Sequence, residues 1–148
     1  MEMTLTGRPL VAGSAEGIAL VSKEPLSLWG GVDPRSGQIT DRRHERSGAI
    51  VTDRVFVFPR GKGSSTSSAT LMESVRNGTA PAAIINVEVD PILALGSIVA
   101  EEMYEKTVPV VLLPEEAFSS IKEGDHIVVA PDGCVTVRRR APGGNESA

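Results

Sequence analysis

Three segments rich in apolar residues alternate with two helical patterns along the middle of the chain. The segments cover residues 49–58, 82–85 and 108–113, and the helical patterns cover residues 67–76 and 91–104. Strands that are apolar at every position are buried on both faces, and helical connections favour parallel pairing. Further strand patterns cover residues 8–21, 127–130 and 134–137. We predict an α/β fold in which a mixed sheet curls into an open barrel with flanking helices.

The length of 148 residues fits one domain. We expect residues 1–140 to form it, with residues 141–148 as a flexible tail rich in glycine, proline and serine. Residues 25–48 contain four glycines and two prolines, which predicts a long loop with a brief hairpin at Gly37. Loops of this length in compact domains are usually functional or disordered. Trp29 within the segment indicates that part of it packs.

Composition excludes several classes of function. The net charge of −4 and an aromatic content of 3% argue against nucleic-acid binding, which needs clustered positive charge and stacking side chains. No apolar run approaches the roughly 18 residues of a membrane-spanning helix. One cysteine, Cys134, cannot form an internal disulfide or a cysteine-ligated metal site within this chain. The first residues show no secretory pattern, so we expect a cytoplasmic protein.

A glycine- and hydroxyl-rich loop, Gly61-Lys62-Gly63-Ser64-Ser65-Thr66, lies between the strongest predicted strand and a predicted helix. Ligands of α/β folds bind at the carboxyl ends of strands, and the amino end of a helix attracts anions. The ammonium group of Lys62 and the hydroxyl groups would add charge and hydrogen bonds. Position and composition leave two interpretations open, an anion or substrate site or a helix cap supplied by one serine.

Five short motifs follow one another in order between residues 28 and 96, and the resemblance that they carry covers roughly residues 8–137. They are Leu28-Trp29-Gly30-Gly31-Val32-Asp33, Asp41-Arg42-Arg43-His44, Gly61-Lys62-Gly63-Ser64-Ser65, Asn77-Gly78-Thr79-Ala80-Pro81-Ala82-Ala83-Ile84-Ile85 and Asp90-Pro91-Ile92-Leu93-Ala94-Leu95-Gly96. Together they resemble the small, swivel subunit of the aconitase X group. The resemblance implies a swivelling β/β/α domain that closes over a large subunit. It also implies that the large subunit, and not this chain, carries the iron–sulfur cluster or mononuclear iron.

The resemblance also implies roles for the residues of the loop. The wider aconitase superfamily carries a Gly-x-Gly-Ser-Ser-Arg loop whose first serine is the catalytic base, which assigns that role to Ser64. The substrate-binding positions implied around it are Lys62, Gly63, Ser65 and Thr66. Thr66 stands where aconitase has a substrate-binding arginine, a departure that disfavours a tricarboxylate. The resemblance favours instead the substrates of the X group, cis-3-hydroxy-L-proline in bacterial members and phosphomevalonate in archaeal ones.

The implied function is that of a small subunit of a heteromeric hydro-lyase. Ser64 would remove a proton α to a carboxylate while the iron of the large subunit assists loss of the hydroxyl. The form of the motifs around Trp29 and His44 favours cis-3-hydroxy-L-proline as substrate, with phosphomevalonate as the alternative. Arg43 and His44 are further candidates for substrate binding, or else part of a solvated loop. A swivelling phosphocarrier that uses His44 and a stand-alone small-molecule-binding module stay open.

Overall fold

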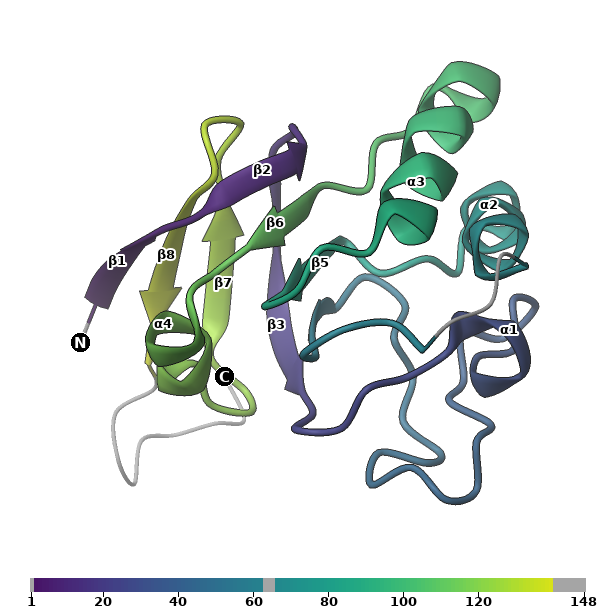
Figure 1. Ribbon diagram of the computed structural model, residues 1–148, viewed down its shortest axis with the longest axis horizontal. Helices are drawn as coiled ribbons and strands as arrows, with labels where there is room; N and C mark the ends of the chain where they lie inside the picture. The colour runs from purple at the N-terminus through teal and green to yellow at the C-terminus, as the bar shows by residue number, and fades with distance from the viewer. Residues whose placement is uncertain (1, 63–65, 140–148) are drawn as a thin grey trace, which may run out of the picture.

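The computed structural model describes residues 2–62 and 66–139, in which eight strands form one mixed sheet flanked by helices (Figure 1). The strands are β1 (Glu2–Thr6), β2 (Arg8–Val11), β3 (Ala15–Val21), β4 (Val55–Val57), β5 (Ala83–Asn86), β6 (Val110–Leu112), β7 (His126–Val129) and β8 (Cys134–Arg138). The helices are α1 (Leu28–Gly31), α2 (Ser67–Asn77), α3 (Pro91–Tyr104) and α4 (Glu115–Ser120).

The sheet is nearly closed into a barrel, as the sequence predicts. Its strand order is β1-β8-β7-β3-β4-β5-β6-β2, with β3 to β6 parallel and the remaining pairs antiparallel. The two edge strands, β1 and β2, are separated in the chain only by Gly7, whose N–H donates to the Gly133 carbonyl over 3.0 Å. A Cβ atom at Gly7 would lie 2.4 Å from Cγ1 of Val111. The closure therefore requires glycine at this corner.

The sheet separates two buried clusters of apolar side chains. Along β4 the side chains alternate, because successive residues of a strand point to opposite faces. Val55 and Val57 pack with α4, β7 and β8, whereas Phe56 and Phe58 pack with α2 and α3. The two phenylalanine rings lie 4.3 Å apart between centroids. Helices α2 and α3 therefore cover one face of the parallel strands, and α4 lies on the other (Figure 1).

The segment between β3 and β4 has little regular structure, as expected, but it is packed. The bridges Val32–Ile39 and Gln38–Ile50 flank a turn at Gly37, whose φ is +77°. Leu28 and Val32 are buried, whereas the side chain of Trp29 is 57% exposed. The segment thus packs through the aliphatic neighbours of the tryptophan.

Candidate active site

The carboxyl ends of the parallel strands β3 to β6 meet along one edge of the sheet. At this edge the segment after β5 lies beside the segment after β4, because the Pro59 carbonyl accepts the N–H groups of Val87 and Glu88 over 2.9 Å and 3.2 Å. Ligands of α/β sheets bind at such an edge. The loop Gly61–Thr66, here called the glycine–serine loop, begins after β4 at this edge. Its predicted position after this strand is confirmed.

The first half of the loop is held by the chain that follows β3. Leu26 and Gly61 form a parallel bridge, in which the N–H of Leu26 donates to the Arg60 carbonyl over 3.3 Å and the N–H of Lys62 donates to the Leu26 carbonyl over 3.2 Å. Leu26 is fully buried, and the Lys62 side chain is exposed. The backbone of Lys62 is therefore fixed while its ammonium group reaches solvent.

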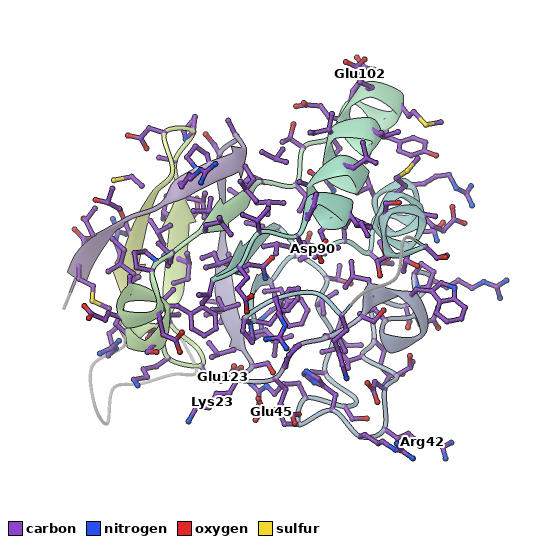
Figure 2. All side chains as sticks on the ribbon, viewed as in Figure 1. Lys23, Arg42, Glu45, Asp90, Glu102 and Glu123 are labelled. Carbon is purple, nitrogen blue, oxygen red and sulfur yellow. The ribbon has the colours of Figure 1, made fainter. Side chains whose placement is uncertain are left out.

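Asp90 lies against the same part of the loop. Its Oδ1 caps α3 by accepting the N–H groups of Ile92 at 3.0 Å and Leu93 at 3.3 Å. Its other oxygen faces Gly61 so closely that a Cβ atom there would lie 1.9 Å from Oδ2. The absence of a side chain at Gly61 thus lets the amino end of α3 approach the loop. Figure 2 shows Asp90 at this end of α3.

The second half of the loop enters α2. The N-cap position of α2 is occupied by Thr66, whose side chain makes no capping bond. The structure therefore does not place a serine at this position, as the capping interpretation expects. Ser67 is buried, and its Oγ accepts the N–H of Trp29 over 3.3 Å and lies 3.4 Å from Oγ of Ser27. Leu26 to Trp29 therefore contact the chain on both sides of the loop.

Three residues of the predicted site, Gly63, Ser64 and Ser65, lie outside the described residues. Their neighbours in the chain are described: Lys62 follows β4, and Thr66 directly precedes α2. The catalytic role of Ser64 and the binding roles of its neighbours stay predictions.

The structure places His44 in a polar network at the end of β3. Its Nδ1 accepts the N–H of Arg46 over 3.1 Å, so this nitrogen carries no proton. Its Nε2 lies 3.2 Å from Oγ of Ser22 and 3.4 Å from the Glu24 carbonyl, which assigns the proton to Nε2. The residue is 6% exposed. A phosphocarrier needs an accessible ring nitrogen, and His44 offers none in this arrangement.

Arg43 is exposed, and its N–H donates to Oδ1 of Asp41 over 3.0 Å. Figure 2 shows the neighbouring Arg42 and Glu102 of α3 at opposite ends of the view, with Asp90 between the two. The hydrogen bonds of His44 connect this segment to Ser22 and Glu24, directly after β3. Substrate contacts by Arg43 and His44 stay a prediction.

Glu45 connects the same segment to β3. Its Oε2 accepts the N–H of Lys23 at 2.6 Å and the hydroxyl of Ser22 at 2.9 Å. The bond from Lys23, followed by the bond from Ser22, holds the pKa of Glu45 below its ordinary value. A carboxyl group with a lowered pKa stabilises the fold above its unfolded pKa, and the contribution is lost as the pH falls through the folded value.

Glu45→Gln is therefore expected to lower the melting temperature at neutral pH, and the difference from wild type should shrink below about pH 4. Thermal unfolding followed by circular dichroism between about pH 3 and pH 7 measures this difference. Glu102→Gln removes a carboxylate from an exposed position of α3 and corrects for the change in net charge. A difference that stays constant across this pH range would exclude the linkage.

Asn86 is a buried residue of the site edge that the sequence analysis does not single out. Its Nδ2 donates to the Phe58 carbonyl over 2.7 Å, immediately before the loop begins, and its side chain is fully buried. Asn86 thereby ties the end of β5 to the start of the loop. The sequence feature that could have identified Asn86 is its position as a polar residue directly after the apolar run Ala82 to Ile85.

Within residues 2–62 and 66–139, no three histidine, cysteine, aspartate or glutamate side chains come together as metal ligands. The described side chains therefore do not fit an iron centre. In the same part of the chain, no helix has both the length and the apolar character needed to cross a bilayer.

Residues 4–137 match the family described as the aconitase X swivel domain. Cis-3-hydroxy-L-proline dehydratase from Pseudomonas aeruginosa is 45% identical over 135 residues, which are 91% of this chain and 23% of that protein. The phosphomevalonate dehydratase small subunit from Methanosarcina acetivorans is 40% identical over 126 residues, which are 84% of this chain and 83% of that one. The chain thus spans less than a quarter of the Pseudomonas protein but most of the Methanosarcina subunit.

Solved structures share the fold. The crystal structure of Thermococcus kodakaraensis aconitase X in its holo-form superposes with a TM-score of 0.83 at 37% identity, covering 93% of this chain and 99% of that chain. A solution NMR structure of a UPF0107 protein gives a TM-score of 0.82 at 38% identity, covering 93% of this chain and all of that one.

Proposed function

Since this chain belongs to the aconitase X swivel-domain family, we propose that it is the small subunit of a heteromeric hydro-lyase. It would act with a large subunit and remove water from a small hydroxylated acid. The position of the glycine–serine loop carries the proposal. The loop joins β4 to α2 at the carboxyl edge of the parallel strands, where a ligand from outside the sheet has access.

Ser64 is the base of the proposed reaction. As the alkoxide it takes the proton from the carbon next to the substrate carboxylate, a carbon–carbon double bond forms, and the hydroxyl on the neighbouring carbon leaves as hydroxide. Return of the abstracted proton from Ser64, directly or through solvent, completes the water molecule and restores the alkoxide. A serine hydroxyl is a poor base unless its alkoxide is stabilised by nearby charge or donors. Lys62 supplies a positive charge on an anchored backbone, and the amino end of α2 supplies N–H groups.

Iron belongs to the large subunit in this proposal, as the resemblance of the sequence motifs to the aconitase X group implies. This chain therefore contributes the base in the proposal, and the site is complete only when the subunits meet. Closure would exclude water from the reacting carbon.

We propose cis-3-hydroxy-L-proline as the substrate, with phosphomevalonate as the second candidate. The Pseudomonas relative, at 45% identity, is named for the first substrate, and the Methanosarcina relative, at 40%, is named for the second. The two molecules differ in chemistry. Cis-3-hydroxy-L-proline carries a ring ammonium beside its carboxylate, whereas phosphomevalonate carries a phosphate at the far end from its carboxylate.

The complex of this chain with the large subunit from the same genome is expected to dehydrate cis-3-hydroxy-L-proline. Its kcat/KM for this substrate should exceed that for phosphomevalonate by at least about 100-fold, because a site with polar groups placed for one substrate leaves them unpaired with the other. Steady-state assays on both compounds measure this ratio, with each subunit alone as the control. A reversed ratio would establish the second candidate, and a complex inactive on both compounds would refute the proposal.

A further inference from the structure

The outward face of α3 is apolar over almost its whole length. Leu95 is 54% exposed, Ile98 is 47% exposed and Met103 is 58% exposed. The other apolar residues of this face are Pro91, Ile92 and Val99, which are exposed or half-buried. A surface helix of a protein that acts alone normally carries polar side chains on its outer face. Contiguous apolar surface of this kind marks an interface.

The inward face of α3 already has a partner within the chain. Leu93, Gly96 and Ala100 are buried against α2 and the sheet, and a Cβ atom at Gly96 would lie 2.9 Å from the Ser68 backbone. The helix is therefore apolar on both sides, which is the pattern of a helix buried between two bodies. The described structure supplies only one of these bodies.

We propose that the outward face of α3, here called the α3 face (Pro91, Ile92, Leu95, Ile98, Val99 and Met103), is the surface on which the large subunit docks. The inference rests on the proposed function. In the Pseudomonas relative the matched region is 23% of a single chain, so the other 77% of that chain is available to contact this domain. The Methanosarcina relatives are named as small subunits, so their partner is a separate chain.

The position of α3 favours the large subunit over a second copy of this chain. The helix starts at Asp90, whose carboxylate faces Gly61, so the α3 face begins beside the glycine–serine loop. A surface next to half of an active site meets the chain that supplies the other half. The exposed Glu102 lies beside the α3 face, at the end of the helix away from Asp90 (Figure 2). The complementary surface is therefore apolar with a basic side chain opposite Glu102.

Ile98→Glu tests the docking surface against a matched control, Ile50→Glu. The two isoleucines are 47% and 44% exposed, and Ile50 belongs to the segment between β3 and β4. Isothermal titration with the purified large subunit from the same genome should show the Kd raised by at least about 30-fold for Ile98→Glu, because a buried carboxylate replaces a central apolar contact. Ile50→Glu should leave the Kd within about twofold of wild type, as expected for a position outside the interface.

Leu95→Glu supplies an independent second variant, and the melting temperature of each variant alone shows that it is folded. Equal Kd values for wild type, Leu95→Glu and Ile98→Glu would overturn the assignment of the surface and leave the proposed function intact. Failure of the wild-type chain to bind the large subunit would overturn both. A dimer of the isolated chain in sedimentation, dispersed by Ile98→Glu, would assign the face to a second copy and also overturn the proposal.

Discussion

Replacing Ser64 with alanine is expected to lower the kcat of the assembled enzyme by about 10³-fold. A positioned general base contributes roughly 10² to 10⁴ in rate, and alanine offers no atom that can accept the proton. Binding of the large subunit should be unchanged, because the substitution removes one hydroxyl and no apolar surface. Turnover measured at saturating substrate, together with the Kd of the two subunits, separates the two effects.

Ser14→Ala is the matched control, since it removes the hydroxyl of an exposed serine directly before β3, at the amino end of the parallel strands and therefore at the opposite edge from the loop. It should retain the wild-type kcat. Wild-type turnover in Ser64→Ala would refute its role as base. A loss of subunit association in the same variant would indicate that the loop is needed for assembly instead.

Gly96→Val is expected to destabilise the chain by about 3 kcal/mol, at the upper end of the usual cost of overpacking. The Cβ atom would lie 2.9 Å from both Cα and the carbonyl oxygen of Ser68, which are backbone atoms that cannot rotate away. Helices α2 and α3 would have to separate. The melting temperature should fall by about 10 °C, given roughly 2–4 °C per kcal/mol at this chain length.

Glu102→Val places the same side chain at an exposed position of α3 and isolates the effect of helix propensity. Its melting temperature should stay within about 2 °C of wild type, because propensity differences are a few tenths of a kcal/mol. Equal melting temperatures for the two variants would mean that the contact of Gly96 with Ser68 does not limit stability. The Gly96 substitution should also reduce kcat, since α2 follows the glycine–serine loop directly.

The elements with strong local signals are the ones that the sequence predicts well. The helix over residues 91–104 is confirmed at both ends, because Asp90 caps it and Pro91 fits its first turn. Gly78 ends α2 in the left-handed conformation, as the Asn77-Gly78 pair predicts. In these places a few neighbouring residues determine the backbone.

Elements that depend on distant partners are predicted less well. The apolar segment 49–58 predicts one long strand, but only Val55–Val57 joins the sheet, and Asp53 turns the chain with a φ of +59°. The strand β1 is not predicted, because its alternating residues 2–6 form a half-exposed edge whose only signal is its pairing with β8. Val51 is apolar because it packs in the core beside α2 and α3, not because it lies in the sheet.

The same division applies to the site. The location of the loop follows from its neighbours in sequence, a strand before it and a helix after it. The contacts that hold it do not, because Leu26 and Asp90 reach Gly61 from 35 and 29 positions away in the chain. The setting of His44 depends on Ser22, which is 22 positions earlier. Pairings across such separations leave no periodic pattern in a single sequence.

The strand that leads into the loop contributes side chains to both buried clusters, with Val55 and Val57 on one side and Phe56 and Phe58 on the other. Local fluctuations of a folded protein expose elements with few buried contacts, and the most deeply packed strands open only on global unfolding. Strand β4 therefore belongs to the part of the molecule that opens last. When exposed segments fray, the start of the glycine–serine loop stays fixed, so the geometry at this end of the site lasts as long as the fold itself.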